Sequence, residues 1–207
     1  MIPALAPASN DVEQLETILR RIEAEPPDTV RSRERSAFDE LASPLGERLV
    51  LFGAGPLGKR VLAGLRKAGV EPLAFADNNP SKWGSQIDGV PVLSPKDAAT
   101  QYGASALFLI AIWSVGHYYR DSRAQLERLG CAHVDSTATL RWKLAPQLLP
   151  DYCQDLPHKL FEQSAEVRKA AFLWADDASL REYLNQVRWR ALGDQDALGS
   201  PVKEEQY

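Results

Sequence analysis

The pattern of hydrophobic and polar residues changes twice along the chain. In the first part, apolar residues recur at helical spacing, at Val12, Leu15, Leu19 and Ile22. Pro26 and Pro27 end this helix, because proline cannot continue a helical hydrogen-bond ladder. A second helix is predicted over about residues 29–41, and its charged run RSRER (31–35) is interpreted as a solvated face.

From residue 47 short apolar runs alternate with amphipathic helical segments. Strands are predicted over residues 47–52, 72–76, 106–113 and 131–136, with helices over 94–102 and 116–129. Residues 88–93 are predicted to be a short edge segment, because Pro91 has no N–H to give to a ladder. This alternation predicts an α/β fold: a Rossmann-like parallel sheet with right-handed crossovers and flanking helices.

Around residue 140 the alternation stops and a proline-punctuated linker leads into two more helices, predicted over about residues 158–172 and 177–192. The last is amphipathic, with Ser179 and Glu182 as a capping pair. Its apolar stripe must pack against a helical neighbour, the sheet domain or a missing domain. We therefore predict three parts: an N-terminal helical segment, a Rossmann-like nucleotide-binding domain and a helical linker region, over residues 1–45, 46–142 and 143–207.

Composition narrows the class of protein. The net charge of −4 over 207 residues argues against nucleic acid as a partner, since phosphate binding needs clustered Lys and Arg. No apolar run reaches membrane-spanning length, and the first residues lack the features of a signal peptide. Cys131 and Cys153 have no C-x-x-C spacing, so we expect reduced thiols and a cytoplasmic protein. We expect Cys131 to be buried.

The glycine-rich turn at residues 53–58, GAGPLG, allows three interpretations. A nucleotide triphosphate P-loop needs Ser or Thr after its lysine, and Arg60 stands there instead. A methyltransferase motif of the S-adenosylmethionine type resembles this turn but has an acid where this chain has Leu51. The third interpretation, the G-x-G-x-x-G of a dinucleotide site, agrees with the sequence best.

In a dinucleotide site each glycine has its own role. Gly53 permits the tight turn, Gly55 lets the backbone approach a pyrophosphate, and Gly58 allows close packing of helix and strand. Asp77, nineteen residues after Gly58, is predicted to accept ribose hydroxyls and to favour NAD over NADP. The neighbouring residues Ala54, Pro56, Leu57 and Asn78 complete the predicted cofactor-binding set. A purely structural glycine turn stays open as the alternative.

The sequence predicts no catalytic residue and no metal site. A hydride-transferring enzyme would need an acid–base group near the sheet, and the only nearby candidates are His117, Tyr118 and Tyr119. The three histidines, which include His133 and His158, lack metal-ligand spacing.

Two stretches resemble known families. Residues 49–95 are similar to the Rossmann-type domain of nucleotide-sugar dehydratases, epimerases and sugar acetyltransferases. Residues 174–198, WADDASLREYLNQVRWRALGDQDAL, with EEQY at the end, resemble the segment before the catalytic module of FkbM-type methyltransferases. The resemblance implies an N-terminal fragment in which Tyr207 would lead into a missing domain. It implies S-adenosylmethionine only for that missing domain.

Three functions follow as hypotheses. The first is a domain that binds a nucleotide or a nucleotide-sugar and acts as a scaffold for a C-terminal methyltransferase domain. The second is an NAD-dependent enzyme that modifies a nucleotide-sugar. The third is a Rossmann-like interaction domain without a ligand. The expected partners are a small nucleotide ligand and the missing domain, with homo-oligomers left open.

Overall fold

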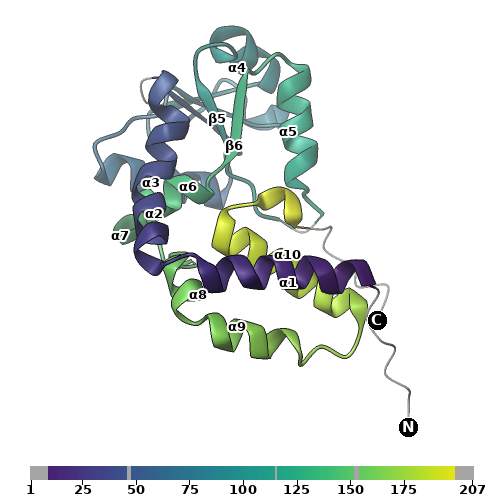
Figure 1. Cartoon of the computed structure of the whole chain (residues 1–207). Helices are drawn as coiled ribbons and strands as arrows, with labels where there is room; N and C mark the ends of the chain where they lie inside the picture. The colour runs from purple at the N-terminus through teal and green to yellow at the C-terminus, as the bar shows by residue number, and fades with distance from the viewer. Residues whose placement is uncertain (1–8, 46–47, 115, 152–153, 199–207) are drawn as a thin grey trace. The chain divides into compact units, whose positions relative to one another are not determined.

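The computed structural model describes residues 9–45, 48–114, 116–151 and 154–198 (Figure 1). Cys153 and Tyr207 lie outside the described residues. The chain forms two compact units, which are described separately. The sheet unit comprises residues 37–149; the helical unit combines the chain up to residue 36 with residues 150–198.

The sheet unit contains six strands in the order β3-β4-β2-β1-β5-β6. In chain order these are β1 Leu49–Phe52, β2 Ala74–Ala76, β3 Gln86–Ile87, β4 Val90–Leu93, β5 Leu107–Ile110 and β6 His133–Ser136. All neighbours are parallel except β3 and β4. The predicted parallel sheet of an α/β fold is confirmed, and the four predicted strands correspond to β1, β2, β5 and β6. From β1 the chain extends the sheet to one side through β2 and β4, then returns to β5 on the other side.

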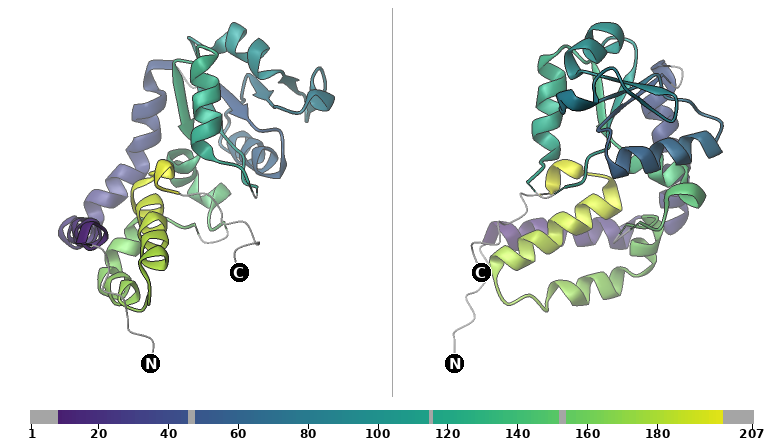
Figure 2. Two further views of the ribbon diagram at one scale, coloured as in Figure 1. Left: turned by 90° about the vertical axis from the view of Figure 1, so that its right-hand side faces the viewer. Right: turned by 180° about the vertical axis from the view of Figure 1, so that it is seen from behind.

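Helices cover both faces of this sheet. Leu49 and Leu51 point to one face, which is covered by α3 (Pro56–Lys67), α6 (Ala138–Lys143), α7 (Ala145–Leu148) and the end of α2 (Pro27–Ala42). Val50 and Phe52 point to the other face, which is covered by α4 (Pro95–Tyr102) and α5 (Tyr119–Arg128). In the view from behind, α3 and α5 lie on opposite sides of the strands (Figure 2). Strands buried on both faces explain the unbroken apolar runs of β1 and β5.

The segment predicted as a sheet edge is not one. β4 pairs with β2 on one side and with the two-residue strand β3 on the other. The cause is a tight hairpin: Asp88 and Gly89 both have positive φ, at 49° and 87°. An Asp-Gly pair is a strong signal for such a turn. The parallel register of β2 and β4 contains two residue pairs, Phe75–Val92 and Ala76–Leu93, which begin directly after Pro91.

Helix starts follow their capping residues. Ser94 accepts a hydrogen bond from the Asp97 amide (3.0 Å) and caps α4, as its sequence predicts. The cap of α10 (Asp177–Leu192) differs from the predicted Ser179–Glu182 pair, since the Asp176 carboxylate accepts from the Ser179 amide (2.8 Å). An acid at this position also complements the positive end of the helix dipole.

The helical unit gathers both ends of the described chain around one core. Its elements are α1 Ser9–Ala24, the first part of α2, α8 His158–Glu162, α9 Ser164–Ala171, α10 and the 3-10 turn η3 Gln195–Ala197. The helix predicted over residues 158–172 is broken near Gln163 into α8 and α9. The apolar stripe of α10 packs against its helical neighbours α1, α8 and α9, which Figure 1 shows around it.

These units do not follow the three consecutive parts predicted from the sequence, 1–45, 46–142 and 143–207. Leu19 and Ile22 of α1 share their core with Leu184 and Val187 of α10. Periodicity reveals which face of a helix is apolar but not which partner buries it. The two terminal segments therefore fold together.

The charged run RSRER is also less solvated than predicted. Glu34 is only 4% exposed and accepts a hydrogen bond from the His158 amide (2.6 Å), at the first residue of α8. Arg33 forms an ion pair with Glu25 and Arg31 one with Glu162. Glu34 is thus buried within the run, whereas Ser32 and Arg35 are exposed. No helix of the described residues is long and apolar enough to cross a bilayer.

Candidate functional site

The candidate site lies at the carboxyl ends of the central strands β1 and β5, where the strand order reverses. β1 and β5 are neighbours, and their connections leave in opposite directions across the sheet. The carboxyl ends of two such strands form the crevice in which open α/β sheets bind ligands. The glycine turn at residues 53–58 follows the carboxyl end of β1, and residues 111–114 and 116–118 follow that of β5.

Two of the three glycines are required by the fold itself. Gly53 has φ +117°, and a Cβ there would lie 2.5 Å from Ile112 Cγ1 and 2.8 Å from the Ala111 carbonyl oxygen. A Cβ on Gly58 would overlap the carbonyl oxygen of Gly53. These contacts support the roles predicted for both residues: the tight turn and the close approach of helix and strand.

Gly55 is different, because the folded chain leaves room for a side chain there. Its backbone is extended, with φ −100° and ψ −167°, a conformation open to any residue. Apart from Gly55 itself and its two chain neighbours, none of the described atoms lies within 4 Å of the position of a Cβ on Gly55. Neither strain nor packing explains a glycine at this position. A ligand that approaches the backbone closely would explain it.

The start of α3 offers amide donors beside Gly55 that have no acceptor within the helix. Gly55 is the N-cap residue, and no described side chain caps the helix. The first bond of the helical ladder runs from the Lys59 amide to the Gly55 carbonyl (3.0 Å). The amides of Leu57 and Gly58 precede it and have no acceptor within the helix. Together with the positive end of the helix dipole, these donors suit an anion such as a phosphate.

Asp77 directly follows β2, and its carboxylate accepts a hydrogen bond from the glycine turn. One carboxylate oxygen, Oδ2, accepts from the Ala54 amide (2.7 Å) and from Lys82 Nζ (2.9 Å). The other, Oδ1, accepts from the Asn79 amide (2.8 Å). A carboxylate has about four acceptor positions, so most of its capacity is already used. The ribose-binding role of Asp77 stays a prediction, and about one acceptor position of the carboxylate is left for a ribose hydroxyl.

The charge of Asp77 is balanced within the protein. Burial opposes its ionisation, but hydrogen bonds from the Asn79 amide, Lys82 and the Ala54 amide together hold its pKa below the ordinary value of 3.8. Its side chain is 12% exposed. The ammonium group of Lys82 offsets the charge of the carboxylate. The predicted preference for NAD over NADP, which needs an uncompensated negative charge to repel the 2′-phosphate of NADP, therefore loses its electrostatic basis.

Lys82 and Trp83 belong to the site, although sequence reasoning missed both. Lys82 is the last residue of η2 (Pro80–Lys82), a 3-10 turn capped by the Asn79 side chain, and Trp83 directly follows it. Lys82 Nζ also lies 3.3 Å from the Ala54 carbonyl oxygen, and the Trp83 indole donates from Nε1 to the Asp77 carbonyl oxygen (2.6 Å). The pair Asn79-Pro80, a capping residue followed by proline, is the signal that could have placed them at the strand end.

The other predicted residues divide into two groups. Ala54, Pro56 and Leu57 lie in the turn: Ala54 is buried, Pro56 is exposed and Leu57 packs partly against the core. Asn78 instead exchanges two side-chain hydrogen bonds with Gln125 of α5 (3.0 and 2.7 Å). The predicted set is thus only partly gathered at the turn.

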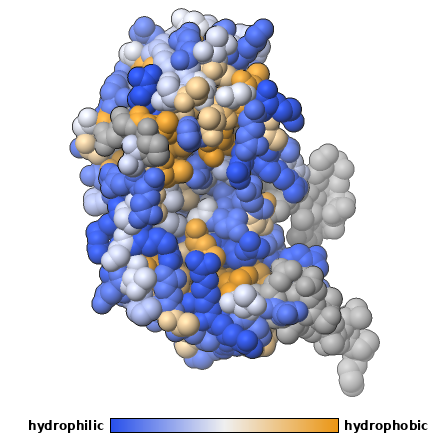
Figure 3. Space-filling model, turned by 45° about the horizontal axis from the view of Figure 1, so that its top comes forward, coloured by the Kyte–Doolittle hydropathy of each residue, from blue (hydrophilic) through white to orange (hydrophobic). Residues whose placement is uncertain are grey.

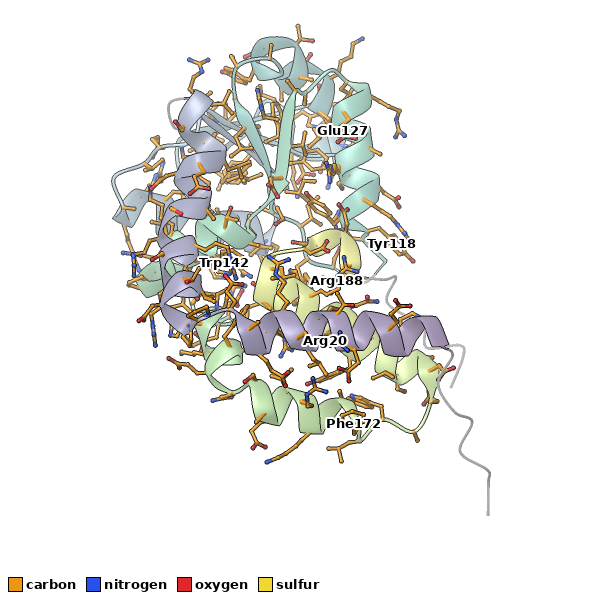
Figure 4. All side chains as sticks on the ribbon, in the orientation of Figure 1. Arg20, Tyr118, Glu127, Trp142, Phe172 and Arg188 are labelled. Carbon is orange, nitrogen blue, oxygen red and sulfur yellow. The ribbon has the colours of Figure 1, made fainter. Side chains whose placement is uncertain are left out.

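The acid–base candidates lie at the start of α5, after the carboxyl end of β5. The His117 ring contacts the Ser122 hydroxyl through Nε2 (2.7 Å), and burial lowers the pKa of His117 from its ordinary value. The Tyr118 ring, labelled in Figure 4, lies 5.7 Å from the Arg120 guanidinium carbon. Tyr119 packs partly against the core of the sheet unit. His117 is therefore neutral near pH 7 and already has a hydrogen-bond partner.

Metal-ligating residues do not cluster in the described part of the chain. No group of three or more His, Cys, Asp or Glu side chains there could hold an ion. Cys131 is buried as predicted, and burial raises the pKa of its thiol to about 11. It is therefore protonated and inert at neutral pH.

Comparison with known proteins shows a distant structural relation. No family model matches the chain, and no curated protein matches its sequence. A methyltransferase FkbM from Methylobacillus flagellatus KT is similar in structure, with a TM-score of 0.65 at 14% identity. The match covers 90% of this chain and 50% of the FkbM chain, so this chain spans about half the length of that protein. At this identity the likeness shows the fold, which is Rossmann-like.

Two other structures share less. UDP-D-quinovosamine 4-dehydrogenase from Vibrio fischeri has a TM-score of 0.32 at 22% identity, covering 43% of this chain and 74% of its own. RSP in complex with β-NADH has a TM-score of 0.37 at 16% identity, covering 82% and 98%. These scores are too low to support a functional argument.

The different roles of the glycines predict different effects of one extra methyl group. We expect Gly58→Ala to destabilise the chain by about 2–3 kcal/mol, because the backbone of Gly53 must move. Gly55→Ala should change the free energy of unfolding by less than about 0.5 kcal/mol, since its methyl group enters open space. Denaturant unfolding measures both. Equal losses for the two variants would contradict the assignment of Gly55 as free of packing.

The bonds of Asp77 predict a pH-dependent contribution to stability. Because folding lowers its pKa, the carboxylate stabilises the fold above its unfolded pKa and loses that effect as pH falls through the folded value. We expect Asp77→Asn to cost about 1–3 kcal/mol at pH 7. The difference in free energy of unfolding between Asp77→Asn and the unmodified chain should then narrow between about pH 5 and pH 2. A constant difference over that interval would show that ionisation of Asp77 does not contribute to stability.

Proposed function

We propose that the sheet unit binds a nucleotide or a nucleotide-linked sugar at the glycine turn. We further propose that the chain is the N-terminal binding and scaffolding region of an FkbM-type S-adenosylmethionine-dependent methyltransferase. In this proposal the methyl transfer belongs to a separate catalytic domain. No residue of this chain is assigned a catalytic role.

The observation that supports binding most strongly is the open space at Gly55. The fold requires glycine at 53 and 58, but at 55 it would accept any residue. Glycine there suits a pyrophosphate that lies against the backbone. The position is at the strand-order reversal, where the fold class places its ligands.

The surrounding residues would act by charge and by hydrogen bonding. The amides of Leu57 and Gly58 would donate to phosphate oxygens, and the dipole of α3 would favour their negative charge. Lys82 would add a cation close to the turn, since its ammonium group lies 3.3 Å from the Ala54 carbonyl oxygen. Asp77 would hold both the Ala54 amide and Lys82 in place.

The FkbM part of the proposal has support from the comparison and from the resemblance of residues 174–198. The sheet unit is little more than half of the 207 residues, yet the match to the FkbM methyltransferase covers 90% of the chain. The likeness must therefore include much of the helical unit as well as the sheet. A plain Rossmann-like domain would not need that extension.

An NAD-dependent enzyme that modifies a nucleotide-sugar is the alternative function. Its support is the G-x-G-x-x-G turn, with His117, Tyr118 and Tyr119 following the neighbouring strand β5. Against it, the His117 ring already has a hydrogen-bond partner in the Ser122 hydroxyl. The third hypothesis, an interaction domain without a ligand, leaves the open space at Gly55 unexplained.

Calorimetric titration tests the proposal. We expect saturable, micromolar binding of UDP-N-acetylglucosamine or NAD⁺ and no heat from S-adenosylmethionine. Gly55→Ala should weaken the nucleotide at least about tenfold, because its methyl group occupies the path of the phosphates. Gln101→Ala alters an exposed residue of α4, outside the predicted binding set, and serves as the control with nearly unchanged affinity.

Three outcomes would count against the proposal. Silence from every nucleotide would leave the turn with a structural role only. Full affinity in Gly55→Ala would place the ligand elsewhere. Methyl transfer by this chain alone would contradict the separate catalytic domain, whereas NAD⁺ binding with hydride transfer to or from a sugar nucleotide would favour the alternative enzyme.

A further inference from the structure

We infer that Trp83 is the stacking platform for the base of the nucleotide that binds at the glycine turn. The inference rests on the proposed function and deepens it, because it states how the base is recognised. It draws on three observations: the exposure of the indole ring, the hydrogen bond that fixes it, and its position beside β2.

Trp83 is exposed although it is large and aromatic. The face of the molecule in Figure 3 is mainly hydrophilic, with smaller hydrophobic patches. The described residues include six large apolar side chains that are exposed: Trp83, Trp113, Leu129, Phe172, Leu173 and Trp174. Single exposed residues of this kind are ordinary. Exposure of 43% leaves Trp83 accessible to a stacking base, and its hydrogen bond and position distinguish it from the other five.

The distinguishing feature of Trp83 is that its ring is held in place. Its Nε1 donates to the Asp77 carbonyl oxygen at 2.6 Å. The carboxylate of the same Asp77 accepts from the Ala54 amide in the glycine turn at 2.7 Å. Trp83 is thus joined to the turn through one residue. Its polar edge has a partner, so the remaining exposed surface of the indole is apolar.

The position of Trp83 selects the base rather than the phosphates. The phosphates would lie at the start of α3, over the carboxyl end of β1. In this fold class the nucleoside extends from there toward the end of β2. Trp83 is tied to Asp77, which directly follows β2. A base that extends in this direction meets the indole ring.

Stacking predicts a particular kind of selectivity. Every base presents a π-face, whereas recognition of one base needs hydrogen bonds to its edge. Lys82, next to Trp83, supplies a cation whatever the base. The expected ligands are therefore nucleoside diphosphates and their derivatives, with similar affinity for adenine and uracil.

Titration of the full chain with ADP, UDP and inorganic pyrophosphate tests this inference. Trp83→Ala should weaken ADP and UDP by roughly 5- to 100-fold and leave pyrophosphate within about twofold. Trp83→Phe keeps an aromatic face and should retain most of the affinity. Trp174→Ala removes a comparably exposed tryptophan from the helical unit and should change nothing.

Each other outcome overturns the inference. Unchanged ADP and UDP affinity in Trp83→Ala would show that no base stacks on the ring. An equal loss for ADP, UDP and pyrophosphate would show that Trp83 only supports the turn. Should the unmodified chain bind none of the three, the proposed function itself fails and this inference fails with it. Normal binding by the unmodified chain separates the two failures.

Discussion

The hydrogen bond from the Ala54 amide to the Asp77 carboxylate joins the two strand ends on which the candidate site is built. It connects the turn after β1 to the residue after β2, and Lys82 is held by the same carboxylate oxygen. Trp83 is fixed through the backbone of Asp77. These groups of the candidate site therefore depend on one carboxylate, and donors of the protein itself already occupy most of its acceptor positions.

Much of the sheet unit could be predicted from the sequence, because local signals there agree with one another. The buried strand β5 is a continuous apolar run, and Ser94 followed by Pro95 marks the start of α4. Gly53 and Gly58 occupy positions that admit no side chain, which is why the turn can be recognised by its glycine spacing. These features depend on neighbours close in the chain or on a fold class that strand–helix alternation already specifies.

Tertiary partners could not be predicted in the same way. Asp88-Gly89 signals a hairpin and Pro91 signals a sheet edge, and local signals alone do not decide between them. The inward direction of Asp77 depends on donors from two separate segments, at Ala54 and Lys82, which no spacing rule brings together. The shared core of α1 and α10 joins residues more than 150 positions apart, such as Leu19 and Leu184. Periodicity alone therefore left the partner of α10 open.

Amide NMR shifts test most directly whether a nucleotide phosphate lies against Gly55 at the start of α3. A ¹H–¹⁵N correlation series recorded during titration with UDP would follow every backbone amide at once. We expect saturable shifts concentrated at Gly55, Leu57 and Gly58, with the distant amide of Gly130 unmoved. Saturable binding that leaves these three amides unshifted, or no saturable shift anywhere, would contradict it.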